Sequence, residues 1–311
     1  MEMRKPSARD FPGLCARYNV KLSPYTTWNV GGVSKILFTP FKRADLIAVM
    51  KWIGDNGMNF YLLGGGSNVL ITDDVLETPV VLTTGMTGIS ARLESGVVFL
   101  DCLAGTSLKE VLSLSVKNGW SGLEFAAGIP GTVGGATAGN AGAVRGSIGS
   151  VVESVTAVER DGSVVKWNAS EITWDYRSCS LFEKTDRVAH SVTFRLHRSE
   201  LGKVAYSVKA AMEDRKTQPS VSRTAGCVFR NPSGDSAGRL LDAAGCKGMR
   251  VGGARVSASH ANFIENIGEC TARDILSLAL ACKKMVQDAF GTLLRFEIKT
   301  IGIEDVWNAP I

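Results

Sequence analysis

One cysteine lies in a short apolar segment and has several possible chemical roles. Cys227 follows Gly226 and precedes Val228 and Phe229 in the stretch TAGCVFRNP. A thiol there could be a small core residue, half of a disulfide, a metal ligand, a redox group or a proton donor. Thiols have an ordinary pKa of about 8.5, so at neutral pH they keep a proton that they can deliver in catalysis. From its neighbours alone Cys227 is most simply a small buried residue, and the other roles stay open.

The cysteine count bears on where the protein works. Its seven cysteines are an odd number, and no two form a Cys-X-X-Cys pair. That argues against a secreted disulfide framework and against a zinc ribbon. The first residues include acids and a proline where a signal peptide would be apolar, and no segment reaches the roughly 20 apolar residues of a bilayer span. We therefore expect a cytoplasmic protein with reduced thiols, no bound metal and no membrane contact.

Length and charge limit the class of partner. The 311 residues suit two or three domains. The formal net charge is +5, from 35 basic and 30 acidic residues that are mixed along the chain. Such a balance argues against a nucleic-acid partner. A small positive excess is compatible with anionic small molecules such as nucleotide diphosphates.

Two glycine-rich stretches could hold such an anion. Residues 61–74 read YLLGGGSNVLITDD, and residues 122–143 read GLEFAAGIPGTVGGATAGNAGA. Glycine lets backbone N–H groups crowd around a phosphate without obstruction by side chains. The first stretch lacks the Lys-Ser/Thr ending of a Walker loop, and Val69 breaks the GxGxxG pattern. Each stretch alone could be an ordinary glycine turn, whereas two in one chain favour a dinucleotide that lies across both.

The elements that must position these residues follow from hydrophobic periodicity. A hairpin is predicted over residues 155–167, with its turn at Asp161-Gly162. The longest predicted helix has Thr271 as its N-cap and Gly291 as its stop. Near residues 197–203 we expect a linker, followed by a further unit that runs to about residue 300. The remaining spacing predicts helices over 43–57, 106–118, 201–215, 236–245 and 271–290, and strands over 60–63, 97–103 and 188–196.

Six motifs, taken together, point to one enzyme family. In order they are LLGGGSNVLI, GLEFAAGIPGTVGGATAGNAGA, WDYRSCSLF, AGCVFRNP, GGARVSASHANFI and FEIKTIG, within about residues 22 to 303. The chain resembles the UDP-N-acetylenolpyruvoylglucosamine reductases, flavoenzymes that complete the muramic acid nucleotide of peptidoglycan. It resembles the shorter of the family's two types, because Tyr176-Arg177-Ser178 lies close upstream of the predicted further unit without a long insertion.

The resemblance implies a fold and a cofactor. The fold class would be α+β, with a two-subdomain FAD-binding module of the vanillyl-alcohol-oxidase (PCMH) type and an α+β substrate-binding domain. Residues 1–85 would form the first FAD-binding subdomain, to which 301–311 return, residues 86–199 the second, and residues 200–300 the substrate-binding domain. FAD would be bound non-covalently. The implied FAD contacts are Gly64, Gly65, Gly66, Ser67, Asn68, Gly128, Ile129, Pro130, Gly131, Thr132, Gly134, Gly135, Asn140, Ala141 and Gly142.

The resemblance also implies a reaction and its partners. NADPH would reduce the bound FAD, which would then pass hydride to the enol ether of UDP-N-acetylglucosamine enolpyruvate. An acid would protonate the neighbouring carbon, and the product would be UDP-N-acetylmuramate. With these small molecules as partners, we expect a monomer that binds neither nucleic acid nor membrane.

Three residues match the family's catalytic positions. Arg177 would stabilise the enolate-like charge on the substrate carboxylate, although by its type alone it could form a surface ion pair. Glu297 would act as a protonated carboxyl, a form that burial favours, although by pattern alone it is an exposed strand residue. Cys227 stands where the family usually has a serine as proton donor.

Three further residues would contact the substrate or the nicotinamide. Arg215 and Asn231 fall where the family contacts the diphosphate. Tyr176 would stack on or hydrogen-bond to the nicotinamide or the substrate, or pack as a strand residue, and His260 is expected to be structural. A different oxidoreductase on the same fold, or a binding protein without catalysis, would not need Arg177, Cys227 and Glu297 together.

Overall fold

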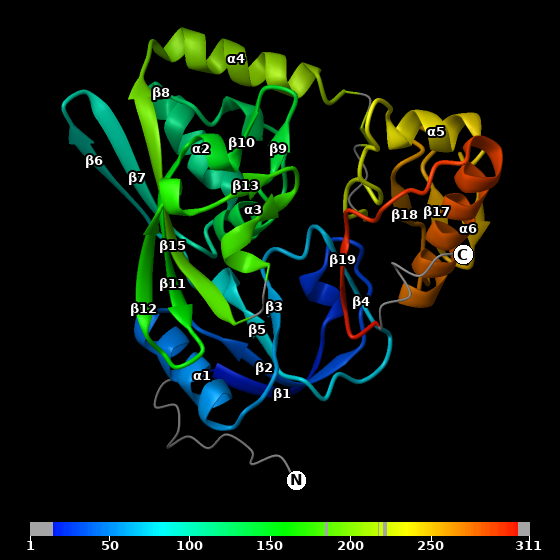
Figure 1. The fold of residues 1–311 in the computed structure, drawn as a ribbon, viewed down its shortest axis with the longest axis horizontal. Helices are drawn as coiled ribbons and strands as arrows, with labels where there is room; N and C mark the ends of the chain where they lie inside the picture. The colour runs from blue at the N-terminus through cyan, green and yellow to red at the C-terminus, as the bar shows by residue number, and fades with distance from the viewer. Residues whose placement is uncertain (1–14, 184–185, 217, 220–222, 304–311) are drawn as a thin grey trace. The chain divides into compact units, whose positions relative to one another are not determined.

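The computed structural model describes residues 15–183, 186–216, 218–219 and 223–303 (Figure 1). The chain forms two compact units. The first unit comprises the described residues up to Tyr18, Ile36–Gly65 and Thr78–Arg215. The second comprises Asn19–Lys35, Gly66–Glu77 and the described residues from Lys216 onward. The division into three domains with boundaries at residues 85 and 199 is a different partition of the chain, and it stays a prediction.

One sheet lies at the start of the chain. Its order is β1 (Cys15–Lys21), β2 (Val33–Thr39), β5 (Val80–Leu82) and β3 (Tyr61–Leu63), and β5 pairs in parallel with both β2 and β3. Helix α1 (Arg43–Asp55) packs Leu46, Met50 and Ile53 into the core that includes Phe38 and Val81. The helix predicted over 43–57 and the strand over 60–63 are therefore confirmed, with slightly shorter bounds.

A six-stranded sheet gives the first unit its second layer. β12 (Val164–Asn168), β11 (Val152–Glu159), β15 (Arg187–Arg198), β7 (Val97–Leu103) and β6 (Ile89–Glu94) follow one another across it (Figure 1), and β8 (Trp120–Ser121) also pairs with β15. All of its pairings are antiparallel. The predicted strands over 97–103 and 188–196 and the hairpin over 155–167 are confirmed. At the hairpin turn Gly162 has a φ of +86°, which glycine adopts without strain.

Helices and short hairpins complete the first unit. Leu108, Val111 and Leu112 of α2 (Leu108–Asn118) pack with Leu100 and Phe194 of the six-stranded sheet, because these α2 residues share one face of the helix. The other elements are α3 (Val133–Ala138), α4 (Leu201–Glu213), the pair β9 (Gly142–Ala143) and β10 (Gly146–Ser147), and the pair β13 (Trp174–Asp175) and β14 (Ser178–Cys179). Short 3₁₀ turns cover Thr83–Gly85, Glu124–Ala126, Ile148–Ser150, Ala169–Glu171 and Ser180–Phe182.

The second unit packs two helices on a small sheet. β16 (Arg250–Val251), β17 (Ala254–Val256) and β18 (Ile264–Asn266) are antiparallel, and α5 (Ala237–Ala243) and α6 (Ala272–Phe290) share their core. β4 (Val69–Ile71) pairs in parallel with β19 (Lys299–Ile301), and Ser23–Tyr25 form a 3₁₀ turn. Helix α6 confirms the prediction for 271–290, because Thr271 caps it through Asp274 and Gly291 ends it with a φ of +65°.

Segments far apart in sequence are tied together inside the second unit. Trp28 is fully buried, and its Nε1 donates a hydrogen bond to the carbonyl of Ile264 at 2.8 Å. Asn266 returns a bond from Nδ2 to the carbonyl of Trp28 at 2.7 Å. Both units combine helices with largely antiparallel sheets, so the predicted α+β class is confirmed.

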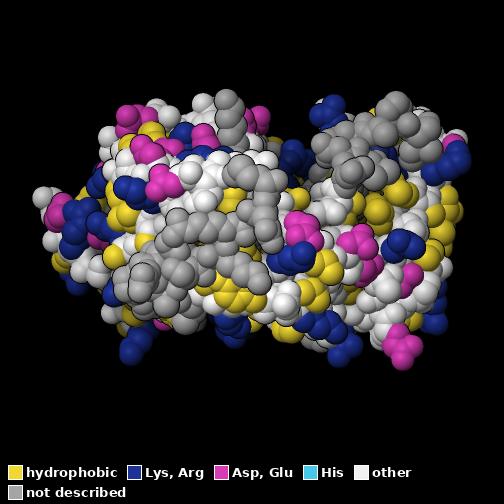
Figure 2. Space-filling view, turned by 90° about the horizontal axis from the view of Figure 1, so that it is seen from below, with side chains coloured by type: hydrophobic (Ala, Val, Ile, Leu, Met, Phe, Trp, Pro, Cys, Tyr) yellow, Lys and Arg dark blue, Asp and Glu magenta, His cyan; other side chains and the backbone are white. Residues whose placement is uncertain are grey.

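Two surface properties bear on partners. On the face drawn in Figure 2, basic and acidic side chains are interspersed and do not separate into single-sign regions. Among the described residues no helix is long and apolar enough to cross a membrane.

Candidate active site

The two glycine stretches meet through bare backbone in the first unit. β3 leads into Gly64 and Gly65. A Cβ added to Gly65 would lie 3.0 Å from the Cα of Gly131, and one added to Gly64 would lie 2.9 Å from Oγ1 of Thr132. Any larger residue at 64 or 65 would therefore push the stretches apart.

The second stretch is anchored by hydrogen bonds around Gly131. The amide of Leu108 donates to the carbonyl of Gly131 at 3.0 Å, and the amide of Val133 donates to the carbonyl of Thr106 at 2.9 Å. Gly131 has a φ of +114°, where most residues would be strained. Thr132 then caps α3, with Oγ1 accepting from the amide of Gly135 at 3.4 Å.

This arrangement fits FAD, because a diphosphate needs backbone N–H groups that side chains do not obstruct. Gly64, Gly65, Gly131 and Thr132 could line such a site. Gly134 also has a packing reason to be glycine, since a Cβ there would lie 2.9 Å from the Cβ of Ala104. The other predicted contacts of the second stretch, Gly128 to Pro130, Gly135 and Asn140 to Gly142, all lie between the 3₁₀ turn at Glu124–Ala126 and the end of β9.

The first stretch continues into the second unit at Gly66. Gly66 has a φ of +64°, and a Cβ there would lie 1.9 Å from the carbonyl oxygen of Tyr25. Its carbonyl accepts from the amide of Thr27 at 3.0 Å. Ser67 and Asn68 follow, and Asn68 donates from Nδ2 to the carbonyl of Glu297 at 3.2 Å. Asn68, itself a predicted FAD contact, is thus hydrogen-bonded to the backbone of Glu297, the predicted catalytic glutamate.

Arg177 lies at the tip of a tight hairpin in the first unit. Asp175 of β13 pairs with Ser178 of β14, so Tyr176 and Arg177 are the two turn residues. Tyr176 is therefore not a packed strand residue; its side chain is exposed, and its ring lies 5.1 Å from the Arg177 guanidinium carbon. Arg177 has a φ of +58°, a backbone region usually left to glycine or asparagine.

Cys227 lies between two neighbouring segments of the second unit. It forms an antiparallel bridge with Phe263, and Phe229 forms one with Phe296. The rings of Phe229 and Phe296 are 4.8 Å apart. Ala225 and Phe229 belong to the hydrophobic core, whereas Cys227 is half-buried outside it. That position argues against the role of a small core residue.

Within the part of the chain that the structure describes, nothing supports Cys227 as half of a disulfide or as a ligand of a clustered metal site. The six cysteines with described side chains are thiols, so Cys227 is not half of a disulfide. No group of three or more His, Cys, Asp or Glu within the described ranges could hold a metal ion. Of the roles that the sequence left open, a redox thiol and a proton donor remain.

Glu297 lies on the segment beside Cys227. Its amide donates to the carbonyl of Val228 at 2.8 Å, and the amide of Arg230 donates to the carbonyl of Arg295 at 2.8 Å. Cys227 and Glu297 therefore occupy adjacent antiparallel segments. Glu297 is half-buried and precedes β19, so it is neither an exposed strand residue nor a fully buried carboxyl.

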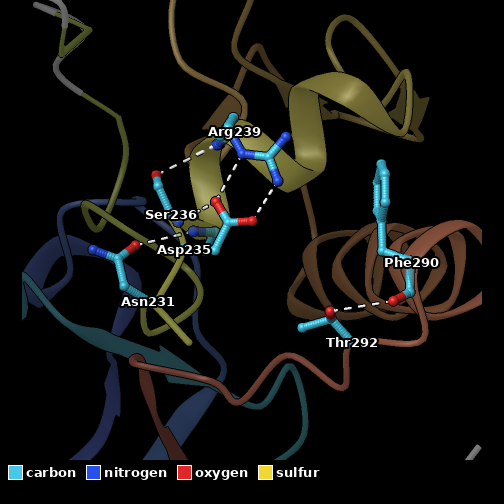
Figure 3. A network of polar contacts seen from close by, with 7 residues as sticks. Asn231, Asp235, Ser236, Arg239, Phe290 and Thr292 are labelled. Carbon is cyan, nitrogen blue, oxygen red and sulfur yellow. Dashed lines mark hydrogen bonds and ion pairs between the residues drawn. The ribbon is translucent and has the colours of Figure 1, made fainter. Parts of the chain in front are cut away.

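Asn231 is fixed at the start of α5 (Figure 3). Its Oδ1 accepts from the amide of Ala237 at 3.0 Å, while Ser236 caps the helix and Asp235 pairs with Arg239. In Figure 3 the amide nitrogen of Asn231 points away from the helix.

Arg215 lies at the end of the first unit. Its Nε is 3.1 Å from the position a Cβ would take on Gly128, so the side chain lies against the second glycine stretch. The second unit thus pairs the segments of Cys227 and Glu297 and also holds Asn231, and the first unit holds Tyr176, Arg177 and Arg215.

Two buried asparagines carry contacts that sequence patterns did not reveal. Asn262, 2% exposed, accepts from the amide of Phe229 at 2.9 Å and donates to its carbonyl at 2.8 Å. Asn140, 7% exposed, bonds the backbone of Asp175 and Gly149. Side-chain bonds to distant backbone have no periodic signature; the only hint was that both residues lie inside the six motifs.

His260 supports the segment that carries Asn262. Its Nδ1 accepts from the amide of Asn262 at 3.2 Å, and its ring meets Phe263 edge to face with centroids 4.9 Å apart. The ring also lies on Gly238, where a Cβ would come 2.9 Å from Cε1. Burial lowers the pKa of His260, which favours a neutral ring in a structural role.

Comparison with known proteins agrees with this arrangement. Residues 218–301 match the family model described as UDP-N-acetylenolpyruvoylglucosamine reductase, C-terminal domain, and residues 34–168 match the model described as FAD binding domain. A UDP-N-acetylenolpyruvoylglucosamine reductase of Moorella thermoacetica is 38% identical, covering 91% of this chain and 92% of that protein. One from Parasynechococcus marenigrum is 36% identical, covering 94% and 98%.

A solved structure leads to the same family. The crystal structure of the UDP-N-acetylenolpyruvylglucosamine reductase (MurB) from Thermus caldophilus superimposes with a TM-score of 0.77 at 31% identity, covering 93% of this chain and 99% of that one. With relatives above 30% identity over nine-tenths of its length, the chain belongs to the UDP-N-acetylenolpyruvoylglucosamine reductase family.

Proposed function

We propose that this protein reduces UDP-N-acetylglucosamine enolpyruvate to UDP-N-acetylmuramate with NADPH, a step of peptidoglycan precursor synthesis. It is an FAD-dependent oxidoreductase of the UDP-N-acetylmuramate dehydrogenase type. The observation that carries the proposal is the pairing of the Cys227 and Glu297 segments inside residues 218–301, the part that matches the reductase-specific model.

The two glycine stretches are proposed to hold FAD non-covalently. The backbone of Gly65 supports this role, because it meets the backbone of Gly131 and Thr132 without intervening side chains, and Gly64 lies beside the hydroxyl of Thr132. When bound, FAD supplies the transfer of hydride from NADPH to the enol ether.

Arg177 is proposed to bind the substrate carboxylate. Hydride addition to the enol ether increases negative charge on that carboxylate, so a fixed guanidinium stabilises the transition state more than the substrate. A guanidinium also clamps a carboxylate at two points. Its place on a short, hydrogen-bonded hairpin restricts its orientation.

Cys227 is proposed to donate the proton that completes the reduction. The thiol proton moves to the carbon next to the site of hydride addition, and solvent returns a proton to the sulfur. Glu297, on the adjacent segment, is proposed as the third catalytic residue, acting beside Cys227 on the enolate-like intermediate.

The remaining contacts are proposed for recognition. Asn231 would donate its amide hydrogens to the diphosphate, and Arg215 would add positive charge. Tyr176, exposed beside Arg177, offers a ring and a hydroxyl to the nicotinamide or the substrate. We further propose a monomer that works in the cytoplasm with no nucleic-acid or membrane partner, built from two FAD-binding subdomains (1–85 and 86–199) and a substrate-binding domain (200–300).

An anaerobic stopped-flow experiment tests the proposal. NADPH should bleach the visible flavin band of the purified protein, and UDP-N-acetylglucosamine enolpyruvate should restore it. UDP-N-acetylglucosamine, which lacks the enolpyruvyl group, is the control and should restore nothing. Bleaching that the enolpyruvate does not reverse would reject this substrate.

A further inference from the structure

Asn140 is a buried residue of the second glycine stretch whose amide is engaged at both ends. Its Nδ2 donates to the carbonyl of Asp175 at 2.8 Å, and its Oδ1 accepts from the amide of Gly149 at 2.9 Å. Its φ of +38° is left-handed, a region that asparagine tolerates better than most residues. Because its carbonyl and one amide hydrogen are used within the protein, the side chain is better suited to holding the backbone than to contacting FAD.

The backbone that Asn140 holds is the base of the Arg177 hairpin. Asp175 is the last strand residue before the turn, and its Oδ1 accepts from the amide of Tyr176 at 2.6 Å. Trp174 lies on Gly149, since a Cβ added there would come 2.6 Å from the indole. Asn140 and Gly149 thus contact two consecutive residues of one strand of the hairpin.

Such support matters because the turn itself is unfavourable. Arg177 has a Cβ yet adopts a φ of +58°. Conformations of this kind persist only where the surrounding structure holds them. A hydrogen bond at the residue that starts the turn helps to hold the backbone from which the Arg177 side chain extends.

We infer that Asn140 is a positioning residue for substrate reduction, which orients Arg177 from within the glycine stretch. The inference rests on the role proposed for Arg177. It links a stretch proposed to hold FAD to the residue proposed to hold the carboxylate, so that cofactor and substrate are set relative to one another.

The substitution Asn140→Asp tests this link. Aspartate keeps an acceptor for the amide of Gly149, loses the donor to Asp175 and tolerates a positive φ. We expect reoxidation of the reduced enzyme by UDP-N-acetylglucosamine enolpyruvate to slow about 10- to 100-fold, the scale of a small misplacement. Flavin reduction by NADPH and FAD content should stay within about twofold of wild type. Asn118→Asp removes a similar amide-to-carbonyl bond at the end of α2 and should leave both half-reactions unchanged.

A double-mutant cycle separates positioning from general damage. If Asn140 acts through Arg177, Asn140→Asp should slow reoxidation by less than about twofold when Arg177→Ala is already present. Equal slowing in both backgrounds, or loss of FAD with both half-reactions impaired, overturns the inference. If Asn140→Asp does not fold, Asn140→Gly removes the amide while accepting the φ, and the same comparisons apply.

The proposed function can fail separately. If Arg177→Ala alone leaves reoxidation at the wild-type rate, the role of Arg177 is wrong and the inference falls with it. If Arg177→Ala is impaired and Asn140→Asp is not, only the inference is overturned.

Discussion

A side chain that delivers a proton to a substrate has to be reachable, and Cys227 is half-buried between core residues. Serine and cysteine have similar shapes, but a thiol is a stronger acid than an aliphatic hydroxyl. Either group can therefore serve as donor at this position.

We expect Cys227→Ser to keep activity within about tenfold and Cys227→Ala to lose about 10²-fold or more, the usual scale of an acid–base role. The loss should fall on reoxidation by the enolpyruvate, because NADPH oxidation needs no proton from this residue. Single-turnover stopped flow of both half-reactions measures the difference. Cys270→Ala, at another partly buried thiol of the second unit, is the control. An alanine variant with wild-type reoxidation would show that Cys227 is not the donor.

At the scale of elements, helices with their own start and stop signals were predictable from sequence. Helix α6 has Thr271, Asp274 and Gly291 at its ends and a single apolar face between them. The β13–β14 hairpin was not predicted, because two-residue strands carry too little periodicity. Arg177 could be identified only through its motif, since its strained turn has no glycine to mark it.

The extended segment that contains Cys227 is held at Phe229 by the side chain of Asn262, which takes the place of a neighbouring strand. Asn262 bonds both backbone groups of Phe229, as a neighbouring strand would. We expect Asn262→Ala to lower the free energy of unfolding by roughly 2–4 kcal/mol, because it leaves a buried amide and a buried carbonyl without partners. Urea unfolding of the holoenzyme measures this.

The control for Asn262 is Asn118→Ala, which removes an exposed amide-to-carbonyl bond at a helix end. That change should cost less than about 1 kcal/mol. If the two variants lose the same stability, the contact between Asn262 and Phe229 is not a structural clamp.

At the scale of the whole molecule, stability should depend on pH through His190. Burial, with a smaller effect of Arg43, lowers the pKa of His190 to about 4, and the side chain is 5% exposed. In the unfolded chain its pKa returns to about 6.5, so the unfolded state binds a proton first as the pH falls. The contribution of neutral His190 to the free energy of unfolding is therefore fully present above about pH 6.5. It is lost as the pH falls toward 4, by up to roughly 3 kcal/mol.

The measurement is the free energy of unfolding at pH 7 and pH 4.5 for wild type and His190→Gln. The variant cannot gain that proton, so it should lose less stability on acidification. Equal losses would mean that His190 does not contribute to the pH dependence.

Local sequence patterns could not predict which segments of the chain make up the second unit. Residues 19–35 join the second unit because Trp28 bonds the backbone of Ile264 and Asn266 bonds the backbone of Trp28. The partners of Trp28 are more than 230 positions away, and no local spacing indicates them. The six family motifs show the order of the segments along the chain, but they do not indicate these contacts.

The second unit is built from segments that lie far apart in the chain, and this affects the protein during its synthesis. Strand β4 pairs with β19, and the register joins Val69 to Lys299. Ribosomes add about 5–20 residues per second, so the 230 residues from 69 to 299 separate the two strands by roughly 10 to 50 seconds of translation. During that interval Trp28 and Leu70 have no completed core to enter. The early apolar segments of the nascent chain therefore lack their partners for that time, and the core of the second unit can be completed only after β19 has emerged.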